Sequence, residues 1–344
     1  MSGDGEDGRA GRRSSVLKAV GLALAGTLVA GCAAAGWAYW HLNSNIKSVD
    51  IDSALGDDRP AKATPTPSAS DAAPLPTEAV NILVLGSDSR SGKENRALGG
   101  GSSTGARSDT AMVVHIDAGR TTATVVSIPR DTLVTRPSCP LESGGTTAVS
   151  YGAMFNSAYA VGGPVCAVRT VESITDVRMD HYVEIDFSGF ARLVNALGGV
   201  TVTTDEDIDD ADSHLTLKAG THHLDGKQAL ALARTRHGIG DGSDLGRIGL
   251  QQQLVKALLA QMSSTSLLTS PAKLYSVADA VTGSLTTDTG LDSLPELMTL
   301  GESLKGLAAA DVKTVTMPVV TAPSDPNRVV AEEPAASELW ESLR

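Results

Sequence analysis

The apolar residues of this chain fall into several short runs, a pattern that indicates β-strands. Residues 81–86 form one such run, and residues 110–116 and 121–128 are rich in β-branched side chains. The last two runs are separated by residues 117–120, whose sequence Asp-Ala-Gly-Arg is typical of a hairpin turn. Further strands are predicted at residues 181–186, 199–204 and 312–320.

A second pattern, with apolar residues three or four positions apart, predicts helices. It is clearest over residues 187–197, which are followed by two glycines that act as a stop signal. Residues 226–236 and 247–262 show the same spacing on either side of a glycine-rich loop. Because strands and helices interleave, the sequence predicts a mixed α/β sandwich. Weaker helices are predicted at residues 271–281 and 291–307.

The N-terminal residues predict a membrane anchor. Four basic residues within positions 1–18 precede an uncharged stretch, residues 19–40, whose length of about 22 residues suits one transmembrane helix. Aromatic residues near its far end suit the headgroup region. The basic flank predicts a cytoplasmic tail over residues 1–18 and an extracytoplasmic location for the chain after residue 40. The alternative is a cleaved lipoprotein signal, because residues 29–32, ending in Cys32, resemble a processing site.

A low-complexity segment separates this anchor from the rest of the chain. From Gly56 to Thr77 the sequence is mostly Asp, Ala, Pro, Thr and Ser, which predicts a disordered spacer that lifts the domain off the membrane. We therefore predict a linker over residues 41–77. The catalytic domain is predicted at residues 78–262, and residues 263–344 are predicted to extend the same domain.

Composition narrows the functional classes. Hydrophobic residues make up 41% of the 344 positions, enough for a core, and aromatic residues only 3%. The formal net charge of −12 argues against nucleic acid as a partner. Cys139 and Cys166 are the two cysteines outside the anchor, and an oxidising compartment favours a disulfide between them over the alternative of two buried free thiols.

Arginine and aspartate residues cluster at the ends of the apolar runs. If those runs are neighbouring strands, the clusters converge on one edge of a sheet, the usual place for ligand chemistry in α/β folds. Guanidinium groups suit phosphate oxygens and carboxylates suit a hard divalent cation, which together indicate a phosphate substrate bridged by a metal. The clustered residues are Asp88, Arg90, Arg107, Asp109, Arg130, Asp131, Arg234, Arg236, Asp244 and Arg247.

Six stretches that contain these residues resemble, in their order, the LytR-CpsA-Psr family of cell-envelope enzymes. The resemblance implies an α-β-α sandwich that buries a polyprenyl chain and holds its pyrophosphate at the mouth. It also implies transfer of a glycopolymer from this lipid-pyrophosphate carrier onto peptidoglycan, with Mg²⁺. One departure is Leu250, where family members often carry a further arginine. The matching stretches are residues 85–90, 107–110, 127–131, 155–163, 183–187 and 224–247.

The residue types allow roles to be assigned. Asp88 and Asp109 are the predicted Mg²⁺ ligands, and Asp244 is the predicted base for the acceptor hydroxyl. Asp131 is expected to fix Arg130 or Arg107. The aspartates could instead be turn residues, and the Arg130–Asp131 pair an ordinary surface ion pair. The predicted catalytic residues are Asp88, Arg107, Asp109, Arg130 and Asp244, and the predicted pyrophosphate ligands are Arg90, Arg107, Arg130, Arg234, Arg236, Arg247 and Gln251.

The lipid is expected in a slot between the sheet and the helices. For each candidate the alternative is plain core packing. The predicted lining residues are Val113, Ile128, Phe155, Phe187, Phe190, Leu193, Leu230 and Leu254.

Two other functions share these residues. A hydrolase could use the same site to cleave lipid pyrophosphate with water instead of a sugar hydroxyl. A membrane-bound transcriptional regulator is disfavoured by the negative net charge and by the predicted extracytoplasmic location.

Overall fold

A computed structural model describes residues 30–62, 78–87, 108–141, 143–236, 244–263 and 270–344. The chain divides into two compact units, Met1–Asn45 and Ile46–Arg344. In the first unit residues 30–45 are helical, and Trp37 stacks on His41 with ring centroids 5.2 Å apart. Across the described ranges, no helix combines the length and the apolar character that crossing a bilayer requires. Residues 19–29 of the predicted span lie outside the described residues.

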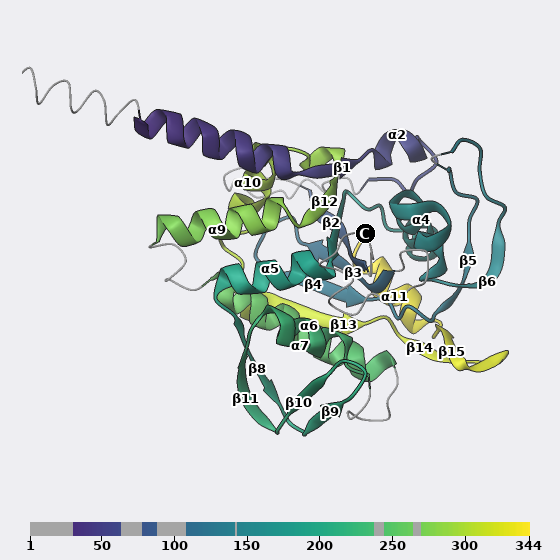
Figure 1. Cartoon of the computed structure of the whole chain (residues 1–344). Helices are drawn as coiled ribbons and strands as arrows, with labels where there is room; N and C mark the ends of the chain where they lie inside the picture. Colours follow the sequence, from purple (N-terminus) through teal and green to yellow (C-terminus); the bar gives the residue numbers. More distant parts are fainter. Residues whose placement is uncertain (1–29, 63–77, 88–107, 142, 237–243, 264–269) are drawn as a thin grey trace, which may run out of the picture. The chain divides into compact units, whose positions relative to one another are not determined.

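The second unit is built on a seven-stranded sheet with the order β1-β12-β7-β2-β3-β4-β13 (Figure 1). β2 runs parallel to β7 and β4 runs parallel to β13, whereas β3 lies antiparallel between β2 and β4. This arrangement confirms the predicted mixed sheet. The strands are β1 (Lys47–Val49), β2 (Val80–Ser87), β3 (Ser108–Ile116), β4 (Ala123–Ser127), β7 (His181–Asp186), β12 (Leu285–Asp288) and β13 (Val312–Thr316).

The hairpin between β3 and β4 forms where the sequence predicts it. The carboxylate of Asp117 accepts hydrogen bonds from the backbone N–H groups of Thr121 and Thr122, at 2.9 and 2.7 Å. Arg120 closes the turn with a positive φ of 55°. The turn fixes the register of the two strands, which determines the residues that stand side by side at their other ends.

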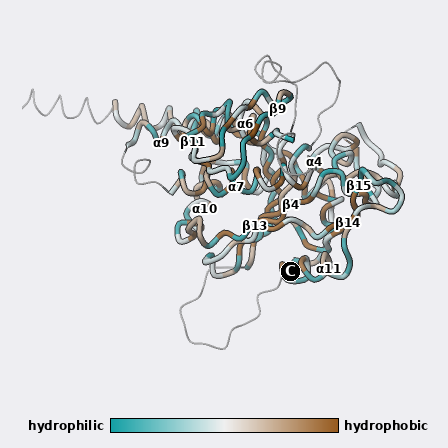
Figure 2. Tube along the Cα trace, turned by 90° about the horizontal axis from the view of Figure 1, so that it is seen from below, coloured by the Kyte–Doolittle hydropathy of each residue, from teal (hydrophilic) through white to brown (hydrophobic). Residues whose placement is uncertain are grey.

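Helices cover both faces of the sheet because successive strand residues point to opposite sides. Leu83 and Val113 belong to a core cluster with α4 and α11, whereas Ile82 and Met112 pack with residues of α7 and α10. Figure 2 shows hydrophobic residues gathered around β4. The helices are α2 (Ile51–Leu55), α4 (Ser157–Thr175), α5 (Phe187–Leu197), α6 (Gly226–Arg234), α7 (Asp244–Met262), α9 (Pro271–Thr282), α10 (Leu294–Ser303) and α11 (Ala335–Glu341), with short 3-10 turns η1 (Thr289–Leu291) and η2 (Ala309–Asp311).

Four two-stranded ribbons accompany the sheet. The ribbons of β8 with β11 and β9 with β10 share an apolar cluster with α5, α6 and α7, which includes Val202, Leu215 and Leu254. Leu250, the departure from the family pattern, is buried in the same cluster. The ribbon strands are β5 (Leu133–Arg136), β6 (Ser150–Met154), β8 (Val200–Thr204), β9 (Ile208–Asp210), β10 (Leu215–Leu217), β11 (Gly220–Leu224), β14 (Val319–Ala322) and β15 (Asp325–Ala331).

The start of the second unit differs from the linker predicted over residues 41–77. β1 is an edge strand of the sheet, paired in parallel with β12, and Ile51 and Leu55 of α2 are buried in the main core. Lys62 then forms an ion pair with Glu78 at 3.2 Å. Lys62 and Glu78, between which residues 63–77 lie outside the described residues, are therefore close together.

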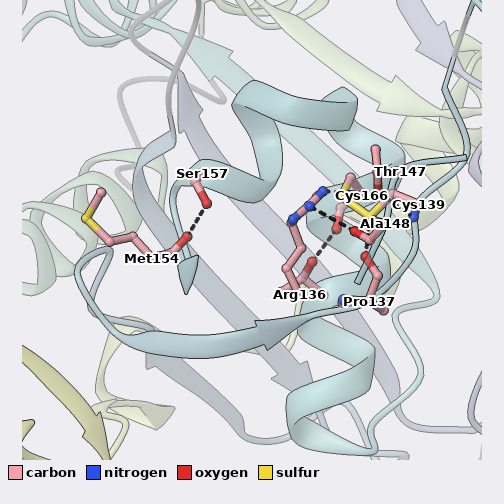
Figure 3. Close-up of a disulfide and its surroundings, with 9 residues drawn as sticks. Arg136, Pro137, Cys139, Thr147, Ala148, Met154, Ser157 and Cys166 are labelled. Atoms are coloured by element: carbon pink, nitrogen blue, oxygen red, sulfur yellow. Dashed lines mark hydrogen bonds between the residues drawn. A yellow bond between two sulfur atoms is a disulfide. The ribbon is translucent and has the colours of Figure 1, made fainter. Parts of the chain in front are cut away.

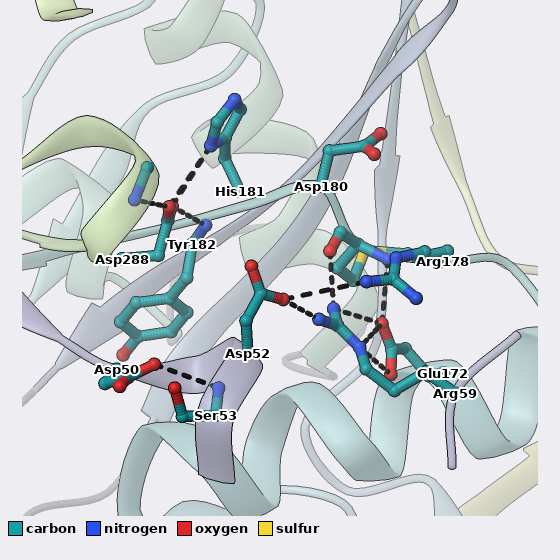
Figure 4. A network of polar contacts seen from close by, with 12 residues as sticks. Asp50, Asp52, Ser53, Arg59, Glu172, Arg178, Asp180, His181, Tyr182 and Asp288 are labelled. Atoms are coloured by element: carbon teal, nitrogen blue, oxygen red, sulfur yellow. Dashed lines mark hydrogen bonds and ion pairs between the residues drawn. The ribbon is translucent and has the colours of Figure 1, made fainter. Parts of the chain in front are cut away.

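Arg59 fixes this first segment to α4 and to the chain just before β7 (Figure 4). Its guanidinium donates to Glu172 of α4, with an Nη2–Oε1 distance of 2.6 Å, and to the carbonyl oxygen of Met179 at 2.6 Å. Asp52 also pairs with this guanidinium. Glu172 and Met179 lie far from Arg59 in sequence, so local composition could not indicate these contacts.

Candidate active site

Strand ends that precede or follow the predicted site residues in sequence lie at one edge of the sheet. Ser87, the last residue of β2, pairs with Ser108 at the start of β3 and with Asp186 at the end of β7. Ser127, the last residue of β4, pairs with Met112 of β3. The ends of β2 and β7 and the start of β3 therefore lie side by side at this edge, and the end of β4 lies near them.

Arg130 and Asp109 meet at this edge. Arg130 Nη1 donates to Asp109 Oδ1 at 2.6 Å, and the two side chains are 15% and 28% exposed. The loop that carries Arg130 is held by two backbone hydrogen bonds, from Thr132 N–H to Pro129 O at 3.1 Å and from Asn156 N–H to Arg130 O at 3.1 Å. The pair is thus fixed at its base while its charged groups remain accessible.

Asp131 lies beside this pair. Its carboxylate is 3.7 Å from Arg130 Nε, consistent with the expected support of Arg130, and 3.7 Å from Arg328 Nη1 of β15. Arg328 was not among the predicted site residues, because β15 reaches the edge only through the tertiary fold. Its sequence signal is a single arginine in a polar segment.

Helix α7 contributes two further predicted residues, Arg247 and Gln251. Arg247 is buried, and its Nη2 donates to the backbone oxygen of Asp109 at 3.2 Å. Gln251, one helical turn later, donates to the backbone oxygen of Ala233 at 3.0 Å. Both were predicted to contact phosphate, and in the structure they hold β3 and α6 against α7.

The end of α6 differs from the predicted helix 226–236. The helix stops at Arg234, because Thr235 has ψ of 133° and leaves the helical conformation. The guanidinium of Arg234 lies over the ring of Phe187, 5.0 Å from its centroid. Arg236 is exposed. The sequence places the two arginines on different sides of a helix, whereas only Arg234 is helical.

The structure does not place every residue of the predicted site. Asp88, Arg90 and Arg107 lie outside the described residues. Asp244 is the first residue of α7. The structure therefore brings together Asp109, Arg130 and Arg247 from the predicted set.

The predicted Mg²⁺ site can be examined through Asp109. The described part of the chain contains no group of three or more metal-binding side chains. Mg²⁺ is commonly held by one or two carboxylates together with substrate phosphates, and Asp109 is a carboxylate of this kind, whereas Asp88 lies outside the described residues. Arg130 already occupies Oδ1 of Asp109, and a cation would have to share that carboxylate with it.

The predicted lipid-lining residues lie in different parts of the core. Val113, Ile128 and Phe155 belong to the cluster beneath α4, whereas Phe190 and Leu254 pack in the cluster around β8. The three remaining candidates are Phe187, which lies against Arg234, Leu193, which packs near α9, and Leu230, which is buried on α6. The slot itself stays a prediction.

The predicted disulfide between Cys139 and Cys166 is present (Figure 3). It links the loop after β5 to α4, with a Cα–Cα distance of 5.2 Å. Arg136, which is buried nearby, donates to Thr147 Oγ1 at 3.1 Å and to the carbonyl oxygen of Ala148 at 3.0 Å. These contacts tie the end of β5 to the connection between β5 and β6.

Comparison with known proteins places this geometry in a family. The model of the family described as LytR_cpsA_psr matches residues 38–344. The chain belongs to the LytR-CpsA-Psr family.

Individual relatives support the same assignment. A probable cell wall biosynthesis protein, LcpB of Corynebacterium glutamicum, is 34% identical over 276 residues, which cover 78% of this chain and 62% of LcpB. TagV of Bacillus subtilis, named a polyisoprenyl-teichoic acid–peptidoglycan teichoic acid transferase, is 32% identical over 238 residues, 68% of this chain and 57% of TagV. The chain thus spans less than two thirds of the length of these relatives. The crystal structure of B. subtilis TagV matches with a TM-score of 0.59 and 29% identity, covering 77% of this chain and 96% of TagV.

One polar group of this LytR-CpsA-Psr chain was missed by sequence reasoning. Glu184 of β7 is buried and accepts hydrogen bonds from the hydroxyls of Tyr159 and Tyr182, each at 2.7 Å. Burial, and then the charge of Glu184, raise the pKa of Tyr182 well above its ordinary value, so this phenol stays a donor. The available signal was a glutamate at an inward position of an alternating strand.

Proposed function

We propose that this chain is a phosphotransferase that moves a glycopolymer from a polyprenyl-pyrophosphate carrier onto a sugar hydroxyl of peptidoglycan. The observation that carries the proposal is the cluster of Arg130, Asp109 and Arg247 at one edge of the sheet. Its support is family membership, together with relatives that are named cell wall biosynthesis proteins and teichoic acid transferases.

The arginines suit the charge changes of this reaction. When the acceptor oxygen attacks the phosphorus that bears the glycopolymer, the bond from that phosphorus to the bridging oxygen breaks and polyprenyl phosphate leaves. Negative charge spreads over the equatorial oxygens, and stabilising it is the main task of the site. Arg130 is partly exposed and can turn its fork of donors toward those oxygens. Arg247 is buried and holds the backbone of Asp109, so it would set the position of that carboxylate and contribute positive charge from behind.

Mg²⁺ is the proposed cofactor, held by Asp109 and Asp88. When bound, it would neutralise charge on the phosphate oxygens. Asp244 is proposed as the base that takes the proton of the acceptor hydroxyl. Arg90, Arg107, Arg234, Arg236 and Gln251 are proposed to complete the pyrophosphate site.

The proposed reaction needs a location at the outer surface of the membrane. Residues 19–40 are proposed as the anchor, with residues 1–18 in the cytoplasm and the second unit outside. The disulfide supports this location, because disulfides persist in oxidising compartments.

Purified full-length protein in detergent would test the function. It is incubated with a lipid-pyrophosphate oligosaccharide, Mg²⁺ and peptidoglycan fragments, and the products are identified by mass spectrometry. The proposal predicts a phosphodiester-linked conjugate that needs Mg²⁺ and is lost in Arg130→Ala. Release of phosphorylated sugar without conjugate would show that the protein hydrolyses the donor and does not transfer it. An unchanged donor would refute both activities.

A further inference from the structure

A buried carboxylate of the β9–β10 ribbon contacts the segment that carries Arg234 and Arg236. Asp210, the last residue of β9, is 2% exposed. Its Oδ2 accepts a hydrogen bond from the backbone N–H of Arg236 at 2.7 Å. Its Oδ1 accepts from the N–H groups of Asp212 and Ser213, at 2.9 and 3.2 Å. One carboxylate therefore joins the turn of the ribbon to the end of α6.

A second contact holds the same segment. Thr235 is 1% exposed, and its hydroxyl donates to the carbonyl oxygen of Ala231 at 3.0 Å. The hydroxyl of Ser213 lies 3.0 Å from that of Thr235. Thr235 is thus enclosed between the ribbon and α6, and Arg236 after it is exposed.

This segment adjoins the cluster at the sheet edge. Gln251 holds Ala233, the residue before Arg234, while Arg247 holds the backbone of Asp109. Arg247 and Gln251 are four residues apart, so they lie on the same face of α7. One face of α7 therefore contacts both the end of α6 and the start of β3.

We propose that Asp210 is a positioning residue that keeps Arg234 and Arg236 turned toward the diphosphate head of the substrate; the proposal rests on the proposed function of the site. Helix α6 stops at Arg234 and Thr235 leaves the helical conformation, so the direction of Arg236 is set by the chain beyond the helix. The bond from Arg236 N–H to Asp210 holds the chain out of the helix. A carboxylate suits this role, because its hydrogen bonds to N–H groups are charge-assisted and its charge offsets that of the two arginines.

The chain supplies a matched control one residue earlier. Asp209 lies on the same strand, is exposed, and accepts a hydrogen bond from Thr216 of β10 at 3.2 Å. Asp209→Asn therefore makes the same change of charge in the same ribbon and leaves the contact to Arg236 intact. Asp210→Asn replaces one of the two accepting oxygens by an NH2 donor, so the side chain can no longer accept from Arg236 N–H and from the N–H groups of Asp212 and Ser213 at the same time.

The test measures binding of farnesyl pyrophosphate, a short polyprenyl pyrophosphate, to the full chain in detergent by calorimetry. Asp210→Asn should weaken binding about tenfold or more, the usual value of a hydrogen bond to a charged group, while Asp209→Asn should change it less than about twofold. Thr235→Val, which keeps the shape but removes the hydroxyl, should show a smaller loss of the same kind.

Repeating the change in an Arg234→Ala/Arg236→Ala background separates positioning from general damage. If Asp210 acts through these arginines, Asp210→Asn should have little further effect there, whereas effects of a structural defect would add. Equal losses in both backgrounds, a loss shared by Asp209→Asn, or unchanged binding in Asp210→Asn and Thr235→Val would overturn the inference. Wild-type protein that binds the probe but transfers no polymer would refute the proposed function and leave the binding series decisive for Asp210.

Discussion

Arg59 and Arg130 each contact a carboxylate oxygen at 2.6 Å, but the two pairs differ in their access to solvent. The side chains of Arg59 and Glu172 are 1% and 3% exposed, whereas those of Arg130 and Asp109 are 15% and 28% exposed. Glu172 also accepts the backbone N–H of Met179 at 2.9 Å, so its lone pairs are engaged within the fold. The same chemical pair is closed in one region and open to a ligand in the other.

The charge balance of the buried pair points the same way. Burial alone would lower the pKa of Arg59, but hydrogen bonds and charge from Glu172, with a contribution from Asp52, raise it above its ordinary value. Arg59 therefore stays charged and fixed between α2 and α4. The comparison teaches that burial and completed hydrogen bonding, rather than residue type, separate a structural ion pair from a candidate substrate site.

The largest expected effect is on stability, at the buried pair. Glu172→Ala leaves the Arg59 guanidinium buried without its main partner, which should lower the free energy of unfolding by about 3–5 kcal/mol. Chemical denaturation measured by circular dichroism checks this. Asp109→Ala is the matched variant and should cost about 1 kcal/mol or less, because exposed pairs contribute little. Equal losses at the two positions would remove the distinction drawn above.

Arg130→Ala should have the opposite profile. Losing a group that stabilises charge in the transition state should slow polymer transfer about 100- to 1000-fold. The unfolding midpoint should stay close to that of the wild type, since the side chain is partly exposed. A transfer assay and a thermal melt on the same preparation measure both quantities. Near-native rates would show that Arg130 is structural.

Arg130→Lys tests the geometry of the open pair more finely. Lysine keeps the charge but lacks the planar fork that contacts two phosphate oxygens at once, so we expect an intermediate loss of about tenfold or more. The KM for the lipid donor and kcat are measured separately. Wild-type values of both would mean that charge alone is sufficient at this position.

Part of this architecture was predictable from sequence because it depends on local chemistry. The β3–β4 turn follows from Asp117, and α5 ends at Gly198 in the left-handed conformation, as its two-glycine stop signal predicts. Asp109 lies at the start of β3 and Arg130 follows β4, and these two strands pair directly, so their meeting could also be anticipated.

The remainder depends on contacts between distant segments. β1 has only three residues, and Arg59 lies in a polar stretch that resembles a linker, yet both belong to the folded unit through β12 and Glu172. Arg328 contacts Asp131, and Asp210 contacts Arg236, from ribbons whose placement cannot be predicted from sequence periodicity. Such residues become visible only when strand order is known.

The smallest expected effect concerns stability in acid and involves Asp288, a carboxylate whose hydrogen bonds, like those of Glu172, are made within the fold. Burial would raise the pKa of Asp288, but hydrogen bonds from His181 and from the backbone N–H groups of Tyr182 and Gly290 outweigh it and lower this pKa below its ordinary value. A carboxylate with a lowered folded-state pKa stabilises the fold above its unfolded pKa. That contribution is lost as the pH falls through the folded value.

Wild-type protein should therefore exceed Asp288→Asn in unfolding free energy by about 1 kcal/mol at neutral pH, because asparagine keeps one accepting oxygen and loses only the charge assistance of the hydrogen bonds. The difference should shrink once the pH falls below about 4, the ordinary pKa of aspartate. Other carboxylates titrate in the same range, but they affect both proteins and cancel in the difference. Urea unfolding at several pH values between neutral and strongly acidic measures it. A difference that stays constant with pH would mean that Asp288 acts through packing and not through its charge, unlike the ion pairs with which it is compared.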